Sequence, residues 1–181
     1  MAQLIPAVNS NDHIYGNLNA ALELVEYGDY QCPYCGRAYT IIKSILQRSD
    51  TDIKFIFRNF PLSKIHPLAL PAAVATEAAA RQDKFWEMHD IIFENQPKLN
   101  AESFFLFAET IGLDTKHFKS DIERKDLAEK VHHDFESGLR SGVNRTPSFF
   151  INGKKYEGSW EEDEFLAYLH DQLAGISISK K

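Results

Sequence analysis

The chain has 181 residues, of which 44% are apolar and 25% charged, a composition typical of a soluble protein that buries a hydrophobic core. No apolar run approaches the roughly 20 residues that a membrane-spanning helix needs. The net charge of −6 disfavours non-specific binding to nucleic acid, and no stripe of Lys or Arg offsets it.

The first part of the chain predicts a β-α-β unit. Residues 1–19 read as an irregular lead-in, and residues 21–27 (ALELVEY) predict a strand. Apolar residues at helical spacing predict a helix from Cys32 to about Arg48, and residues 49–52 (SDTD) predict a turn. The alternating segment 53–60 (IKFIFRNF) predicts a second strand. We therefore expect the two strands to be parallel, with a right-handed crossover between them.

A helical block follows, from about Pro67 to Arg140. One of its helices is expected to begin at an N-cap, Asn100, and to end at Gly112. Another is expected to end at Gly142 and carries an apolar stripe at i, i+4 spacing, formed by Leu127, Val131, Phe135 and Leu139.

Strands then return near the C-terminus. The segments 147–151 and 154–158 flank Asn152-Gly153, which is a signal for a two-residue hairpin. Residues 159–162 match a capping box that would open a last helix, which is expected to reach about Leu173 and to leave a loose tail. The predicted order is therefore β-α-β, a helical block, and β-β-α.

Cys32 and Cys35 are the only cysteines and form a C-x-x-C motif between the first strand and its helix. A disulfide across two intervening residues closes too small a loop to restrict the unfolded chain strongly, so stability explains the pair poorly. With Pro33 in the first turn, unpaired N–H groups and the helix dipole would stabilise a Cys32 thiolate, and such thiolates have pKa values of roughly 3.5–7.5. Cys35 lies one turn on, close enough to form a disulfide. The pair is therefore interpreted as a dithiol–disulfide switch.

Two other interpretations of the pair are free thiols without chemistry and half of a zinc site. Zinc needs two further ligands at suitable spacing. His132 and His133 are adjacent, so they would face different sides of their helix, and the other histidines are scattered. The residues favour redox chemistry, and no metal ligand is assigned.

Thr146-Pro147 is the second candidate motif. The local interpretation is that Pro147 opens a strand, which proline tolerates at the first position. The bond could be cis or trans, and trans is the commoner form for any X–Pro bond.

Four stretches of the chain resemble DsbA-type members of the thioredoxin superfamily. They are LVEYGDYQCPYCG, FRNFPL with the following HPLA, KFWEMHD, and GVNRTPSFFINGKKYEG, and they occur in the family's order over about residues 13–173. The resemblance implies an α/β thioredoxin fold, β-α-β plus β-β-α, with an inserted helical domain. It divides a single DsbA-like domain into thioredoxin-fold segments at 20–62 and 143–174 and a helical insertion at 63–142.

The resemblance also implies a substrate-binding surface. It implies a cis Thr146-Pro147 bond beside the cysteines, in a loop whose backbone pairs with a substrate peptide like an added strand. Pro33 and Tyr34, between the cysteines, are expected to complete this surface. The namesake oxidant has Pro-His at these two positions, whereas Pro-Tyr is the glutaredoxin pairing. Tyr34 supplies no cation beside the thiolate, so strong oxidising power is not expected.

Glu26 is a candidate proton relay. It shares a strand face with Leu22 and Leu24, so it should point inward below the cysteines, although an acid near a strand end could also reach solvent. A buried carboxylate there could accept the Cys35 proton during resolution. The resemblance implies the same role, because the family places an acid six residues before its first cysteine.

The sequence therefore predicts a thiol:disulfide oxidoreductase with Cys32 as nucleophile and Cys35 as resolving thiol. Its substrates would be protein thiols and disulfides, and a redox partner would regenerate it. One alternative is a glutathione-dependent transferase or isomerase on the same scaffold, although such relatives typically lack the second cysteine. Another is a module that binds an iron–sulfur cluster or a metal through Cys32.

No organic cofactor is implied, because the chain has no phosphate-binding glycine loop. The N-terminal stretch MAQLIPAVNSNDHIYG has neither a basic n-region nor an apolar h-region. The sequence thus predicts a cytoplasmic protein, or a periplasmic or secreted one if a leader has been removed.

Overall fold

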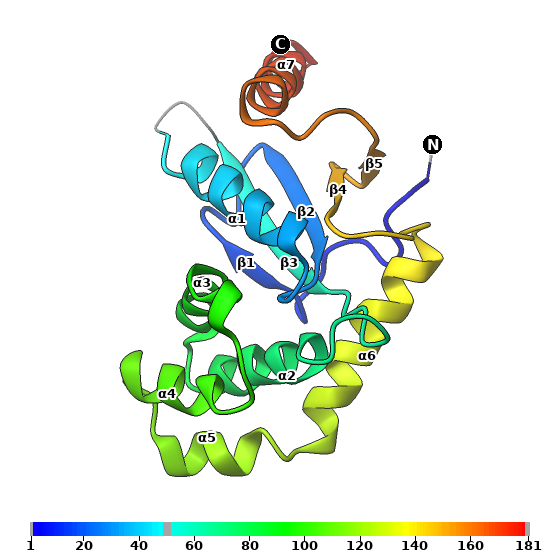
Figure 1. Ribbon diagram of the computed structural model, residues 1–181. Coiled ribbons are helices and arrows are strands. Elements are labelled where there is room, and N and C mark those ends of the chain that lie inside the picture. Colours follow the sequence, from blue (N-terminus) through cyan, green and yellow to red (C-terminus); the bar gives the residue numbers. More distant parts are fainter. Residues whose placement is uncertain (1, 49–51, 180–181) are drawn as a thin grey trace.

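The computed structural model describes residues 2–48 and 52–179 as a five-stranded mixed sheet with helices packed against it (Figure 1). Its elements run in this order: β1 (His13–Tyr15), β2 (Leu22–Gly28), α1 (Pro33–Leu46), β3 (Ile53–Asn59), α2 (Ala69–Ala80), α3 (Phe85–Glu94), the 3-10 helix η1 (Gln96–Lys98), α4 (Ser103–Thr110), α5 (Thr115–Asp121), α6 (Lys125–Arg140), β4 (Ser148–Ile151), β5 (Lys154–Tyr156) and α7 (Glu162–Ser179).

The sheet has the strand order β1-β3-β2-β4-β5. Strands β2 and β3 are parallel, which confirms the predicted β-α-β unit, and the other neighbours are antiparallel. The β4–β5 hairpin is also confirmed, because Asn152 and Gly153 have the positive φ angles, 47° and 76°, that a tight hairpin turn requires. Tyr27 near the end of β2 pairs with Ser148 at the start of β4. The start of α1 and the loop before β4 therefore lie at the same end of strands β2 and β4.

The two faces of the sheet bury different clusters. Leu22 and Leu24 of β2 face α1 and join a core that extends into helices α2 to α7. The alternate residues Val25 and Tyr27 face the other way, toward the N-terminal segment and α6. Because successive residues of a strand point to opposite faces, β2 is buried on both sides and supplies both cores.

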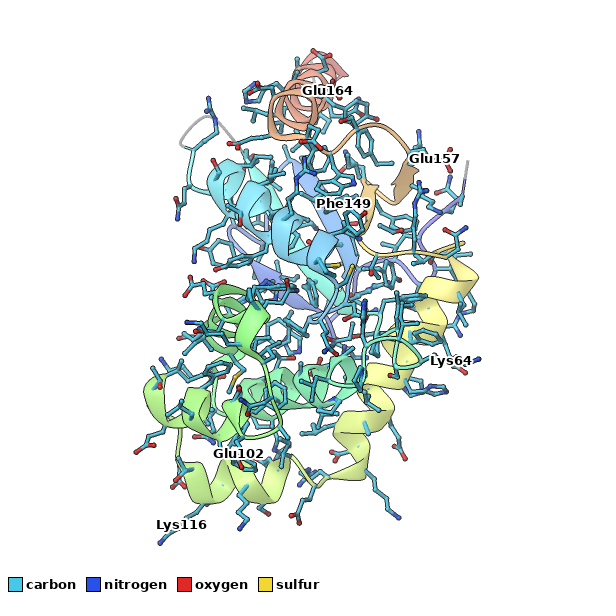
Figure 2. All side chains as sticks on the ribbon, viewed as in Figure 1. Lys64, Glu102, Lys116, Phe149, Glu157 and Glu164 are labelled. Atoms are coloured by element: carbon cyan, nitrogen blue, oxygen red, sulfur yellow. The ribbon has the colours of Figure 1, made fainter. Side chains whose placement is uncertain are left out.

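Helices α2 to α6 lie between β3 and β4 in the chain and gather together in the lower part of the molecule as viewed in Figure 1. The alanine-rich α2 is buried along most of its length and packs against α3 and α6. Lys116 on α5 extends into solvent at the end remote from the sheet, whereas Phe149 lies in the sheet beside α1 (Figure 2). Within the described residues, no helix is long and apolar enough to cross a membrane.

The N-terminal lead-in was expected to be irregular, and the structure corrects this at β1. His13–Tyr15 pair antiparallel with β3, the Trp86 indole N–H donates to the Ile14 carbonyl at 3.3 Å, and the His13 ring stacks on Phe85. Three residues are too few to show a strand periodicity, and the pairing depends on β3 and α3. The predicted turn at 49–52 falls mostly outside the described residues.

Two predicted helix starts are wrong by a few residues. The Asn100 side chain accepts from the N–H groups of Glu102 and Ser103, so it closes a turn before α4 rather than capping the helix. Helix α7 begins at Glu162, where the Ser159 hydroxyl accepts from the Glu161 N–H at 3.3 Å and the Glu162 carboxylate accepts from the Ser44 hydroxyl at 2.6 Å.

Helix ends also differ from expectation. Helix α7 continues through Gly175 to Ser179, past the expected end at Leu173, because one glycine within a helix costs only about 1 kcal/mol relative to alanine. On α6, Leu127 and Val131 are buried as expected, but Leu139 at the end of the stripe is 54% exposed.

A buried ion pair between Asp12 and Arg58 links the N-terminal segment to the sheet. Arg58 on β3 donates to both carboxylate oxygens of Asp12, at 2.7 and 2.9 Å, and to the Tyr27 hydroxyl at 2.9 Å. The side chains of Arg58 and Asp12 are only 2% and 4% exposed. Bonding to the guanidinium lowers the pKa of Asp12 despite its burial, which by itself would raise it.

We expect Asp12→Ala to lower the free energy of unfolding by about 3–5 kcal/mol, because it leaves the Arg58 cation buried without its partner. Urea unfolding of the variant and of wild type measures the change. The exposed Arg124–Asp126 pair provides the control, and Asp126→Ala should lower the stability far less, because solvent screens a surface pair. Equal losses in the two variants would contradict the assigned role of the buried pair.

Candidate active site

The two cysteines lie at the start of α1. Cys32 is the N-cap residue, with extended dihedral angles (φ −72°, ψ 121°), and Pro33 occupies the first helical position, where its missing N–H costs nothing. The Cys32 carbonyl accepts from the N–H groups of Cys35 and Gly36 at 3.0 and 3.1 Å. Both cysteines are free thiols, and Cys32 is 5% exposed whereas Cys35 is fully buried.

The Cys32 sulfur is surrounded by hydrogen-bond donors. The Cys35 thiol donates to it, which is the largest influence, and this lowers the pKa of Cys32 to about 5 although burial opposes the shift. The N–H groups of Cys35 and Tyr34 lower the pKa further. Cys32 is therefore a thiolate at neutral pH, the form that attacks disulfides.

Cys35 has the opposite tendency. Burial raises its pKa well above the ordinary value, and its hydrogen bond to Cys32 and the negative charges of Glu26 and Cys32 raise it further. The Asp29 N–H donates to the Cys35 sulfur at 3.4 Å. The pair thus divides into an ionised outer thiol and a protonated inner one.

The loop before β4 lies against Cys32. The Cys32 sulfur lies 3.6 Å from the Thr146 carbonyl oxygen, to which it can donate only when protonated, and Thr146 and Pro147 are both buried. The Thr146–Pro147 peptide bond is cis. Beside this loop lies a groove of about 360 Å³, whose walls include Tyr34, Arg145, Pro147, Tyr156 and Trp160. Tyr34 is 63% exposed, so its ring is available to a molecule in the groove.

Glu26 points into the core beneath the cysteines, on the β2 face that also carries Leu22 and Leu24. It is 2% exposed, and its Oε1 atom has no hydrogen-bond partner. Its neighbours across the sheet are Phe57 on β3 and Phe149 on β4, which carry no charge. Burial raises the pKa of Glu26 to about 8, and the negative charge of Cys32 contributes to the shift.

Asp29 is a site residue that the sequence argument missed. Its side chain is fully buried, and one carboxylate oxygen accepts from the N–H groups of Gln31 and Cys32 at 2.8 and 3.2 Å. The other oxygen accepts from the Leu62 N–H and from His66 Nδ1, each at 2.8 Å. The sequence does contain a signal for this role. An aspartate whose side chain can bind the N–H groups two and three residues further on is typical of an Asx turn.

The histidines considered for zinc do not approach the cysteines in the described part of the chain. His132 and His133 are exposed on α6, where His132 pairs with Glu136 at 3.2 Å. Among the described residues, no group of three or more His, Cys, Asp or Glu side chains is placed to hold a metal ion.

Comparison with known proteins places these features in context. A family model described as thioredoxin matches residues 8–171. The chain is 35% identical over 175 residues to the Na(+)/H(+) antiporter NhaA 1 of Salinispora arenicola, and this match covers 97% of the chain. The chain spans only about a quarter of the length of the curated relatives it matches, 27% in this case.

Two solved structures from Wolbachia pipientis share the fold. With alpha-DsbA1 the TM-score is 0.83 at 20% identity, over 96% of each chain. With the thiol-disulfide exchange protein alpha-DsbA2 it is 0.79 at 22% identity, over 90% of this chain and 88% of that one. The expected thioredoxin fold of DsbA type is thereby confirmed. The chain belongs to the thioredoxin family, and its fold is that of the DsbA-like proteins.

Proposed function

We propose that this protein is a thiol:disulfide oxidoreductase that exchanges a Cys32–Cys35 disulfide or dithiol with protein substrates through a mixed disulfide at Cys32. The observation that carries the proposal is that the pKa values of two hydrogen-bonded thiols are shifted in opposite directions. The pKa of Cys32 is lowered to about 5, whereas that of Cys35 is raised. An ionised nucleophile and a protonated second thiol are what a two-step exchange needs.

In the reducing direction, the Cys32 thiolate attacks one sulfur of a substrate disulfide and expels the other as a thiolate. Cys35 then loses its proton and attacks Cys32, which releases the second substrate sulfur and forms the Cys32–Cys35 disulfide. In the oxidising direction, a substrate thiolate attacks Cys32 and expels Cys35, and a second substrate thiolate then releases Cys32. Both directions move two electrons and use the same mixed disulfide.

Glu26 is proposed as the proton acceptor for Cys35. Its raised pKa of about 8 and its unpaired oxygen beneath the cysteines support this role. A base with a pKa near the operating pH can take up and release a proton in each cycle. Its cross-strand neighbours Phe57 and Phe149 carry no charge, so burial is the main cause of the raised pKa.

Substrate binding is assigned to Thr146, Pro147, Pro33 and Tyr34. The proposed division of labour follows the two expected parts of the domain. Segments 20–62 and 143–174 carry the cysteines and the substrate loop, and the helical insertion 63–142 supports them. We also propose that a separate redox protein regenerates the cysteine pair. A cytoplasmic location stays a prediction.

Cys32→Ser should abolish both the reduction of insulin disulfides and the oxidation of a dithiol peptide, because the remaining thiol, Cys35, is fully buried and its pKa is raised. Turbidity of reduced insulin and loss of free thiol measure the two activities. Retention of either activity would refute the assignment of Cys32 as nucleophile.

Cys35→Ser should accumulate a mixed disulfide, because the resolving thiol is missing while Cys32 still attacks. A disulfide-containing substrate incubated with the variant should give a new band on a non-reducing gel that disappears on reduction. Cys32→Ser provides the matched control and should give no such band. Failure of Cys35→Ser to trap any substrate would count against the resolving role.

Glu26→Gln should slow resolution of the mixed disulfide at neutral pH by roughly 10²-fold, the contribution typical of a positioned base. The rate of the first attack by Cys32 should change little. Rapid-mixing measurements of the two phases separate these steps, and equal slowing of both would contradict a relay to Cys35.

The pH dependence of the free energy of unfolding gives an independent check on the raised pKa of Glu26 in the reduced protein. Its folded-state pKa is raised from 4.5 to about 8, so the folded state holds the proton longer than the unfolded state does. Wild type should therefore lose stability relative to Glu26→Gln as the pH rises from about 4.5 to about 8, by on the order of 3–5 kcal/mol in total. A constant difference across this range in urea unfolding would show that Glu26 is not buried as a neutral acid.

A further inference from the structure

Gln96, in the short helix η1, reaches across to the loop that carries Cys32. Its side-chain amide Nε2 donates to the carbonyls of Tyr30 and Cys32, each at 2.9 Å. These carbonyls stand on either side of Gln31, so one amide group holds both ends of a three-residue segment. The Cys32 carbonyl is also the acceptor of the first hydrogen bonds of α1.

Gly36 makes room for this amide. A Cβ atom at Gly36 would lie 2.3 Å from Gln96 Oε1, closer than real atoms approach, and 3.0 Å from its Cδ. Gly36 has no positive φ angle in this structure, so backbone conformation does not call for glycine there. The glycine after Cys35 is therefore explained by the side chain that lies against it.

We propose that Gln96 is a positioning residue that holds Cys32 at the start of α1 through the backbone carbonyls of Tyr30 and Cys32. The inference rests on the proposed function, because it concerns the reactivity of the same nucleophile. The N-cap geometry directs the Cys32 sulfur toward the N–H groups of Tyr34 and Cys35. If the segment before Pro33 moves, these donors lose their alignment with the sulfur, since hydrogen bonds weaken steeply with angle.

Other groups near the sulfur are not altered by changing Gln96. Cys35 and Glu26 interact electrostatically with Cys32, and the Asp29 carboxylate accepts from the Cys32 N–H. Gln96 itself is neutral, so its removal changes no charge. A shift in Cys32 titration on changing Gln96 would therefore report the position of the loop.

The test compares Gln96→Ala with Gln82→Ala in the reduced full chain. Gln82 is a matched control, because its side chain also makes two hydrogen bonds to backbone, with the carbonyl and N–H of Asp114, far from the cysteines in the helical block. The pH dependence of Cys32 alkylation by iodoacetamide gives the apparent pKa, and thermal unfolding gives the loss of stability. We expect Gln96→Ala to raise the Cys32 pKa by about one unit, roughly tenfold in acidity, and Gln82→Ala to leave it at the wild-type value.

Gly36→Ala tests the same contact from the other side. The added methyl group displaces the Gln96 amide, so the Cys32 pKa should rise as it does in Gln96→Ala. In the double variant Gly36→Ala, Gln96→Ala the two shifts should not add, because either change alone removes the contact.

The outcomes separate this inference from the proposed function. A wild-type Cys32 with an ordinary pKa and no exchange activity would overturn the proposed function and the inference with it. A wild-type thiolate of low pKa that responds equally to Gln96→Ala and Gln82→Ala would overturn the inference alone, as would additive shifts in the double variant.

Discussion

The structure depends on one arrangement: the Cys32 sulfur sits at the N-cap of α1, among donors that favour its anion. The Cys35 thiol contributes most, and the N–H groups of the first helical turn contribute less. This order matters, because a helix start alone would act on any group placed there, whereas the thiol–thiolate bond exists only in the reduced pair. The same bond that activates Cys32 holds Cys35 in place for resolution.

The helical block contributes to this arrangement although it carries no reacting atom. His66 binds the Asp29 carboxylate, which in turn holds the Cys32 N–H, and Gln96 binds the Cys32 carbonyl. The segment before α1 is thus held from both sides by residues between β3 and α4. This organisation resembles that of a metal site, in which outer side chains fix the orientation of the ligands.

Much of the fold could be predicted from the sequence because its signals are local. The spacing of apolar residues predicted the parallel β2–β3 pair, and Asn152-Gly153 predicted the hairpin. The strand β1 and the length of α7 depend on packing against distant elements, which periodicity does not reveal. At the site, the motif and the strand face located Cys32 and Glu26, but Gln96 acts over 64 residues of separation. Nothing near Gln96 in the sequence distinguishes it from any other glutamine.

The most direct test of the account is the apparent pKa of Cys32 in the reduced wild-type protein, measured from the pH dependence of its alkylation with mass spectrometry to identify the modified residue. The account predicts a midpoint at about 5, with Cys35 unmodified throughout. A midpoint near the ordinary thiol value of about 8.5 would contradict it, because the start of α1 would then not stabilise the anion on which the proposed exchange depends.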